Sequence, residues 1–76
     1  MRYYLTGKGK LAKANFGMFL RNPNRYRILK YMQKRRLKGY SLEEIQNNSG
    51  GINREFRLGI SKEIKKMVSL DYIVRK

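Results

Sequence analysis

Residues 41–45 read Ser41-Leu42-Glu43-Glu44-Ile45, a helix start from which the rest of the fold can be worked out. A serine followed three residues later by a glutamate is a capping box, in which the hydroxyl caps free amides and the carboxylate reaches back. The pattern predicts a short helix over residues 42–48 with Leu42 and Ile45 facing inward. The Asn48-Ser49-Gly50-Gly51 run that follows has turn chemistry and should end this helix.

A second helix start lies upstream, at Asn22-Pro23. Asparagine accepts hydrogen bonds from free amides at an N-cap, and proline suits the first turn. We expect a helix over residues 23 to about 37, ended by Gly39. At about 100° per residue, its apolar and basic side chains separate onto opposite faces. The apolar face carries Ile28, Leu29 and Met32, and the basic face carries Arg27, Lys30 and Lys34.

A third helix is expected downstream, over residues 53–69, because apolar residues recur there at spacings of three and four. The residues that should face inward are Phe56, Ile60, Ile64 and Met67. The opposite side of the same wheel collects Arg54, Leu58, Ser61, Lys62 and Lys65. After this helix, residues 72–74 read Tyr-Ile-Val, an aromatic and β-branched run that predicts a short strand.

Residues 11–20 are expected to form a helix that is apolar on more than one face. One stripe consists of Leu11, Ala14 and Met18, whereas Phe16 and Leu20 fall away from it. We expect Phe16 to pack onto the sheet or under Tyr31 in a small core. The alternative cover for this second stripe is another copy of the chain or a neighbouring protein.

Four segments follow one another at characteristic spacing: Asn22-Pro23-Asn24-Arg25-Tyr26-Arg27-Ile28-Leu29-Lys30, Ser41-Leu42-Glu43-Glu44-Ile45, Ile60-Ser61-Lys62-Glu63-Ile64-Lys65-Lys66-Met67 and Asp71-Tyr72-Ile73-Val74. Together they resemble the winged helix-turn-helix proteins typified by the arsenic-repressor family, over residues 22–76. The resemblance implies an α+β, mainly α, fold. The length of 76 residues allows only one small core, so we expect a single domain spanning residues 1–76. It makes 42–48 the supporting helix and 53–69 the recognition helix, whose groove-facing residues would be Arg54, Leu58, Ser61, Lys62 and Lys65. Winged helices bind DNA, RNA and proteins alike, so the fold does not decide the function.

The wing of such a fold needs a second strand, and only Arg75 and Lys76 follow residues 72–74 in this sequence. The front of the sequence resembles the missing part, since an aromatic run over residues 3–5 leads into a threonine-capped helix start. We therefore expect a permuted wing, in which residues 3–5 pair antiparallel with 72–74 and Arg2 lies beside Arg75 and Lys76. The alternative is that residues 1–9 form a flexible basic arm.

Charge sets the class of partner. The 76 residues carry 19 Lys and Arg against 5 Asp and Glu, a net charge of +14, and residues 1–40 contain 12 of the basic side chains and no acid. Such a balance favours polyanions. Cysteine and histidine are absent, which removes disulfides, Cys/His metal sites and Cys or His nucleophiles. We expect no enzyme activity, cofactor, metal, small-molecule substrate or membrane association, and a cytoplasmic location.

The residues expected to bind nucleic acid are spread along the chain. They are Arg2, Lys8, Lys10, Lys13, Arg27, Lys30, Lys34, Arg35, Arg36, Arg54, Arg57, Ser61, Lys62, Lys65, Arg75 and Lys76. The Gly7-Lys8-Gly9-Lys10 run lacks the spacing of a nucleotide P-loop, and we interpret it as a helix start close to a nucleic-acid phosphate. Tyr3 and Tyr31 are candidates for base stacking, with packing in the core or at its rim as the alternative.

Two classes of function compete. A structural RNA-binding component of a ribosomal subunit should carry charge on several faces, because RNA surrounds it. A DNA-binding winged-helix regulator, or a chromatin-type DNA-binding protein, should concentrate charge on the recognition helix and wing. The six basic residues expected within 23–37, on a helix that would point largely away from a DNA groove, favour ribosomal RNA. In that setting Phe16 and Leu20 would contact neighbouring ribosomal proteins. A protein adaptor in a polymerase or replication complex is a third class.

Overall fold

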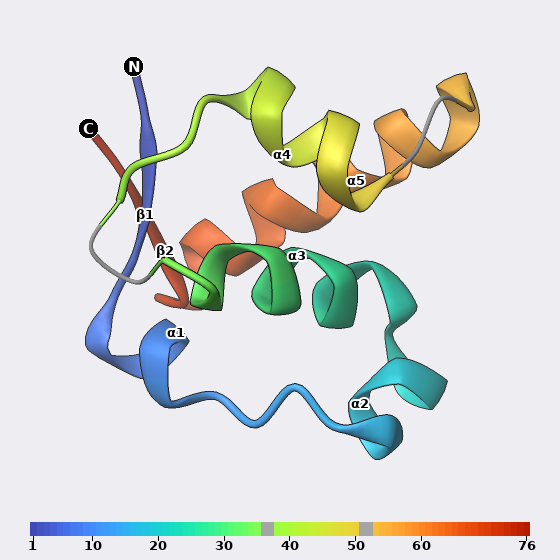
Figure 1. Cartoon of the computed structure of the whole chain (residues 1–76), viewed down its shortest axis with the longest axis horizontal. Helices are drawn as coiled ribbons and strands as arrows, with labels where there is room; N and C mark the ends of the chain where they lie inside the picture. Colours follow the sequence, from blue (N-terminus) through green and yellow to red (C-terminus); the bar gives the residue numbers. More distant parts are fainter. Residues whose placement is uncertain (36–37, 51–52) are drawn as a thin grey trace.

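The computed structural model describes residues 1–35, 38–50 and 53–76. In these ranges the chain is mainly helical, with one two-stranded antiparallel sheet. The elements in chain order are β1 (Tyr3–Leu5), α1 (Gly7–Leu11), α2 (Phe16–Arg21), α3 (Pro23–Gln33), α4 (Leu42–Ser49), α5 (Arg54–Ser69) and β2 (Ile73–Arg75) (Figure 1). None of the described helices is long and apolar enough to cross a membrane.

The three central helices begin where the sequence predicts. The Asn22 side chain accepts a hydrogen bond from the Arg25 amide at 3.2 Å, with Pro23 in the first turn of α3. Both halves of the capping box at Ser41 and Glu44 are present at the start of α4. Side-chain caps supplied by the residue just before each helix therefore position α3, α4 and also α5, which Asn53 caps.

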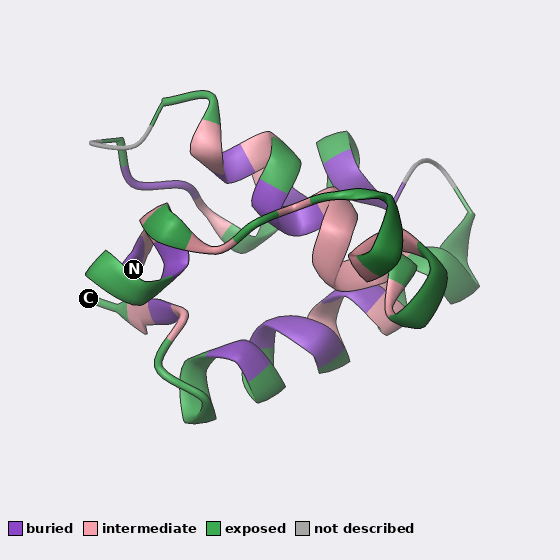
Figure 2. Ribbon diagram, turned by 90° about the horizontal axis from the view of Figure 1, so that it is seen from below, coloured by how far each residue is buried: buried purple, intermediate pink, exposed green. Residues whose placement is uncertain are grey.

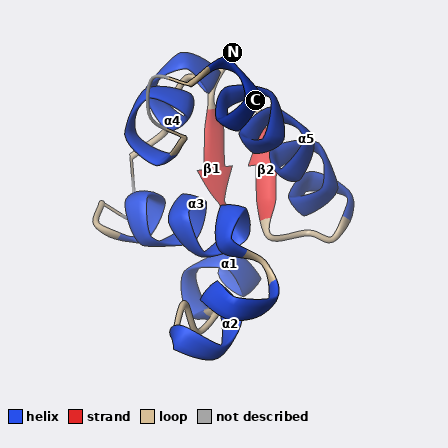
Figure 3. Cartoon of the chain, turned by 90° about the vertical axis from the view of Figure 1, so that its right-hand side faces the viewer, coloured by secondary structure: helices blue, strands red, loops and turns tan. Residues whose placement is uncertain are grey.

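The sheet joins the two ends of the chain (Figures 1 and 3). β1 pairs antiparallel with β2 in the register Tyr3↔Arg75, Tyr4↔Val74 and Leu5↔Ile73. This confirms the predicted pairing, one residue further along in the second strand, and the alternative of a flexible arm over residues 1–9 is wrong for residues 3–9. The other edge of β1 makes a bridge that the sequence did not predict, because Tyr3 and Tyr40 exchange backbone hydrogen bonds of 2.7 and 2.9 Å.

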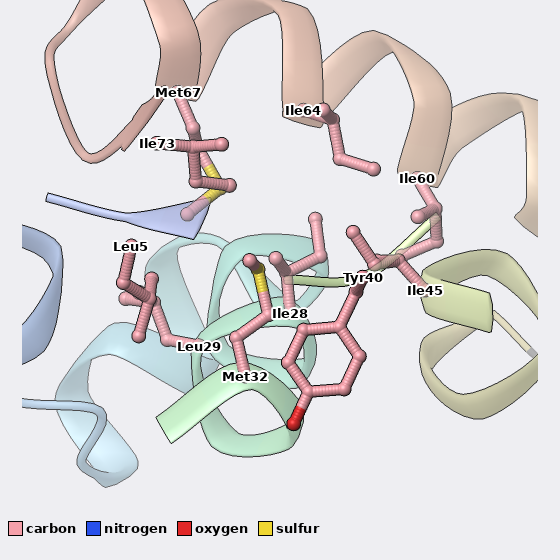
Figure 4. Packing of buried hydrophobic residues seen from close by; sticks show 10 residues of the cluster. All are labelled: Leu5, Ile28, Leu29, Met32, Tyr40, Ile45, Ile60, Ile64, Met67 and Ile73. Carbon is pink, nitrogen blue, oxygen red and sulfur yellow. The ribbon is translucent and has the colours of Figure 1, made fainter. Parts of the chain in front are cut away.

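The core lies between α3, α4, α5 and the sheet (Figure 4). Its buried residues are Leu5, Ile28, Leu29, Met32, Tyr40, Ile45, Ile60, Ile64, Met67 and Ile73. The predicted inward faces of α3 and of the last three turns of α5 are therefore confirmed. In Figure 2 the outer sides of these helices are exposed, and α1 and α2 are mostly exposed or intermediate.

The predicted helix over residues 11–20 is wrong. α1 ends at Leu11 and α2 begins at Phe16, because the Asn15 side chain accepts a hydrogen bond from the Met18 amide at 3.0 Å and starts a new helix. The Gln33 amide donates to the Gly9 and Ala12 carbonyls at 3.0 and 2.8 Å, which satisfies the end of α1 without continuing it. The 70% exposed Phe16 contacts neither the sheet nor Tyr31; instead it stacks on Phe19.

Three further expectations need correction. α3 ends at Gln33, short of residue 37, since the chain must extend to bring Tyr40 beside β1. Phe56 was expected to be buried, but it is 52% exposed because the first turn of α5 lies at the edge of the molecule (Figure 1). Leu42 is 36% exposed at the rim of the core. Arg36 and Gly51 lie outside the described residues.

Candidate nucleic-acid interface

The first concave surface lies where the resemblance places the recognition helix and wing. This α5 groove, of about 280 Å³, is bounded by α4, α5 and the sheet. Its lining residues are Tyr3, Leu42, Ser61, Ile64, Lys65, Val68 and Arg75. Lys65 and Arg75 are exposed, so the groove combines a mainly apolar floor with cations from the helix and from the strand.

Not all of the predicted groove residues reach this surface. Ser61 lines the groove, but its hydroxyl donates to the Arg57 carbonyl at 3.2 Å and lies 2.5 Å from the Gln46 amide nitrogen. It therefore holds α5 against α4. Arg54 and Lys62 are exposed and do not line the groove. The structure brings together Lys65 and Arg75 as cations of the groove, and leaves the others along the exposed side of α5.

A second concave surface runs along the basic face of α3, opposite the C-terminal end of α4. The larger part, the α3–α4 pocket, has a volume of about 470 Å³. It is lined by Tyr26, Arg27, Lys30, Tyr31, Lys34, Asn48 and Ser49. A smaller part of about 260 Å³, the Tyr40 pocket, is lined by Tyr31, Lys34, Arg35, Lys38 and Tyr40. The two pockets share Tyr31 and Lys34, so they form one continuous basic and aromatic surface.

The periodicity of α3 explains this composition. Tyr26, Lys30 and Lys34 recur at intervals of four, and Arg27, Tyr31 and Arg35 form the adjacent row. On a helix such rows lie side by side on one face. The face therefore alternates rings with cations. Its cations are among the residues predicted to bind nucleic acid, whereas Tyr26 is not. The same holds for Lys38, Tyr40, Asn48 and Ser49, of which only Lys38, in the basic run after α3, carries a signal visible in the sequence.

The positive charge of the α3–α4 pocket is not compensated within the described residues. Arg27, Lys30 and Lys34 form no salt bridge there, and none of the described residues that line either pocket is acidic. Lys38 approaches Glu44 at 3.9 Å, at the far end of the Tyr40 pocket. Cations gathered without counter-charges favour the binding of an anion.

Aromatic neighbours hold two of these cations in place. The Arg27 guanidinium lies 5.9 Å from the ring centres of both Phe19 and Phe56, and the Lys30 ammonium lies 5.7 Å from that of Tyr26. Such cation–π contacts are worth about 0.5–1 kcal/mol at exposed sites. Phe56, although outside the core, therefore helps to position a cation of the pocket.

The predicted stacking residues are only half-buried rings, not open platforms. Tyr31 packs against Tyr40 at 4.8 Å between ring centres, and its hydroxyl accepts a hydrogen bond from Asn48 at 3.3 Å. Burial raises the pKa of Tyr31, and the Glu44 carboxylate raises it further, so the ring is neutral at physiological pH. Tyr3 lies at the wall of the α5 groove. The most exposed rings are Phe16 and Phe56, at 70% and 52%.

The basic residues of the N-terminal segment are partly engaged in the fold. The Arg2 guanidinium donates to the Gly39 carbonyl at 3.1 and 2.8 Å and to the Glu44 carboxylate at 3.1 Å. Arg2 lies beside Lys76 as predicted, because their backbones exchange hydrogen bonds, but its guanidinium is directed to Gly39 and Glu44. Lys8 donates to the Leu70 carbonyl at 3.0 Å.

Among the remaining predicted residues, Lys13, Arg35 and Lys76 are exposed, whereas Lys10 and Arg57 are half-buried. Of the two glycines beside Lys8, Gly9 is buried against the backbone of Tyr72 and Gly7 is exposed, and the approach of a phosphate to this helix start stays a prediction. Arg36 lies outside the described residues. The candidate interface therefore consists of the α5 groove and of the two pockets along α3.

Comparisons with models of known protein families, with curated proteins and with solved structures gave no match. The assignment of function therefore depends on the residues and geometry described above.

Proposed function

We propose that this chain is a structural RNA-binding protein, a component of a ribosomal subunit that neutralises rRNA phosphates and packs against folded RNA. The observation that carries the proposal is the uncompensated cationic surface of α3, formed by Arg27, Lys30 and Lys34 together with tyrosine rings. Cations beside aromatic rings suit RNA, whose unpaired bases stack while its phosphates are neutralised.

The element order supports a winged helix with a permuted wing. α3, α4 and α5 follow one another as in the helical core of that fold, and β2 follows α5 as the first strand of a wing. β1 pairs with β2 from the other end of the chain. In this arrangement α5 is the recognition helix, and the basic pocket of α3 is lined by other residues than the α5 groove.

The placement of charge favours RNA over DNA. Duplex DNA that occupied the α5 groove would leave the pockets of α3 without a ligand, since no residue that lines the groove also lines either pocket. A folded RNA offers phosphates and unpaired bases to several surfaces at once. Phe16 and Leu20, 70% and 65% exposed, supply an apolar surface that we assign to neighbouring ribosomal proteins.

A DNA-binding winged-helix regulator, or a chromatin-type DNA-binding protein, is the second candidate. The observation in its favour is the α5 groove, where Lys65 from the helix and Arg75 from the strand border one apolar hollow. This is the place where a recognition helix and wing would contact a duplex.

Two matched double variants separate the candidates. Lys30→Ala/Lys34→Ala removes two exposed cations from α3, and Lys62→Ala/Lys65→Ala removes two exposed cations from α5. We expect the α3 variant to bind a structured rRNA fragment more weakly and to lower the slope of log affinity against log salt by about two, one for each lost phosphate contact. Surface changes of this kind usually alter stability by no more than about 0.5 kcal/mol, which thermal unfolding checks.

The outcome that contradicts the RNA assignment is the reverse pattern. If the α5 variant loses duplex DNA binding while the α3 variant binds both nucleic acids like the wild type, the chain is a DNA-binding protein. Sedimentation of a lysate on a gradient gives an independent measurement, in which the protein should migrate with a ribosomal subunit and not with nucleoid DNA.

A further inference from the structure

Ser49 is a buried polar residue whose hydroxyl makes no hydrogen bond within residues 1–35, 38–50 and 53–76. It is the last residue of α4 and is 8% exposed. A buried hydroxyl without a partner has lost its hydrogen bonds to water and makes none to the protein, and such groups are uncommon in folded proteins. Ser49 also lines the α3–α4 pocket.

The two sides of this pocket differ in chemistry. The α3 side supplies the three cations Arg27, Lys30 and Lys34, and the α4 side supplies the neutral polar groups of Asn48 and Ser49. Tyrosine rings complete the wall. A bare phosphate would use only the cations. A ligand that uses both sides carries an anionic group at one end and a flat, hydrogen-bonding group at the other, and a nucleotide has both.

The dimensions agree with such a ligand, because small-molecule sites usually have volumes of about 300–1,000 Å³ and this pocket, which is open to solvent, has a volume of about 470 Å³. A base inside a duplex cannot enter, since its edge is paired and its faces are stacked. The occupant must therefore come from a single strand, a loop or a bulge.

We propose that the α3–α4 pocket binds one unpaired nucleotide of an RNA strand, with its phosphate on the α3 cations and its base or ribose hydrogen-bonded to Ser49 Oγ. This inference depends on the proposed RNA-binding function and adds the kind of nucleotide and the residue that recognises it. Because Ser49 Oγ is closed to solvent in the free protein, the contact requires a change to another staggered χ1 rotamer on binding.

The decisive variant is Ser49→Ala, tested with a short labelled single-stranded RNA and with the duplex of the same sequence. We expect the affinity for the single strand to fall about threefold to tenfold, as for the loss of one neutral hydrogen bond. The affinity for the duplex should not change. The melting temperature should stay the same or rise, because the variant removes an unpaired buried hydroxyl.

Ser69→Ala is the matched control. Ser69 is exposed at the end of α5 and its hydroxyl donates to the Lys66 carbonyl at 2.8 Å, away from the pocket. This variant should bind both RNAs like the wild type. If the melting temperature of Ser49→Ala falls together with its RNA affinity, the hydroxyl stabilises the fold and does not bind the nucleotide. This result would overturn the inference.

The remaining outcomes separate this inference from the function on which it depends. If Ser49→Ala binds the single strand like the wild type while Lys30→Ala/Lys34→Ala binds it weakly, the nucleotide pocket is wrong and RNA binding stands. If the wild type binds neither RNA, both proposals fail. A single-stranded DNA that binds as tightly, with the same loss in Ser49→Ala, would support the pocket and overturn its assignment to RNA.

Discussion

Gly9 is the residue at which the N-terminal segment fits most closely against the rest of the chain. A Cβ at this position would lie 2.1 Å from the Tyr72 carbonyl oxygen and 2.9 Å from Leu5 Cδ2. The same carbonyl accepts a hydrogen bond from the Thr6 amide at 3.0 Å, so it cannot move away freely. Gly9→Ala should cost about 1–3 kcal/mol, as overpacking usually does. Each kcal/mol lowers the melting temperature of a domain of this size by about 4–8 °C.

Gly7→Ala is the control, because it makes the same chemical change in the same helix. A Cβ at Gly7 would meet nothing within 4 Å. Alanine is the better helix former by about 1 kcal/mol, so this variant should melt at the same temperature as the wild type or higher. Equal losses in the two variants, measured by circular dichroism, would show that the contact with Tyr72 is not the cause.

Glu44 is the carboxylate on which the junction between α4 and the N-terminal segment depends. It accepts hydrogen bonds from the Ser41 amide at 3.0 Å and from Arg2 at 3.1 Å. The Ser41 amide is the main reason that the pKa of Glu44 lies below its usual 4.5; the Ser41 hydroxyl, Arg2 and Lys38 lower it further, against a smaller opposing effect of burial. The unfolded chain therefore takes up this proton more readily than the folded protein does.

The stability that Glu44 provides should be complete above pH 4.5 and lost as pH falls through the lowered pKa. We expect Glu44→Gln to melt below the wild type at pH 7 and to approach it at acidic pH. Glu43→Gln removes the same charge from an exposed neighbour, so its difference from the wild type should vary less with pH. If the melting temperatures of the two variants change with pH in the same way, this role of Glu44 is refuted.

At the scale of elements, the packing of α3 on α5 includes one buried ion pair. Arg25 Nε lies 2.8 Å from Glu63 Oε2, the two side chains are 17% and 9% exposed, and Asn22 donates to Glu63 Oε1 at 3.3 Å. Removing one partner of a buried pair leaves the other without compensation. Glu63→Gln should therefore lower the free energy of unfolding by about 3 kcal/mol, the lower end of the range for such losses.

Glu55→Gln is the appropriate comparison, since Glu55 lies on the exposed first turn of the same helix. It should change stability by no more than about 0.5 kcal/mol. Urea unfolding of both variants measures the two free energies directly. If Glu63→Gln is as stable as Glu55→Gln, the ion pair contributes little and the apolar core alone holds α3 against α5.

The predictable elements are those whose signals are local. α3, α4 and α5 begin at cap residues that can be recognised in the sequence, and their buried faces follow the helical period. The break between α1 and α2 has one local signal, the cap residue Asn15, but the end of α1 depends on Gln33, far along the chain, and has no local signal. The α3–α4 pocket needed the structure for the same reason, because Ser49 reaches the basic face of α3 only through the packing of α4.

At the scale of the whole molecule, charge is the dominant property. The net charge of +14 means that part of any affinity for a nucleic acid comes from released counterions. If about 6–10 phosphates are neutralised, affinity should fall by about 10³–10⁵ between 50 and 200 mM salt, on the scale of duplex DNA. Binding isotherms at several salt concentrations measure this slope. A nearly flat response would remove electrostatics as the basis of recognition.

The two-stranded sheet that β1 and β2 form can be closed by a turn. Arg2 and Lys76 exchange backbone hydrogen bonds of 2.7 and 2.9 Å, which is the pairing that a two-residue hairpin turn joins. A circular permutant that runs from Lys76 through Asn-Gly into Arg2, with new ends between Lys13 and Ala14, should fold to the same structure. Its melting temperature should equal or exceed that of the native chain, because an Asn-Gly turn favours the register already present.

The new ends are placed in the link between α1 and α2, where Lys13 is exposed and regular structure is absent from residues 12–15. A backbone-cyclised chain with the same Asn-Gly turn and no new ends separates the effect of closure from that of the cut. If both forms keep the melting temperature and the RNA affinity, the order of β1 and β2 in the chain is irrelevant to function, as the proposed permuted wing requires. If cyclisation itself destabilises the protein, the strands at its two ends do not form a wing-like hairpin, and the permuted arrangement is wrong.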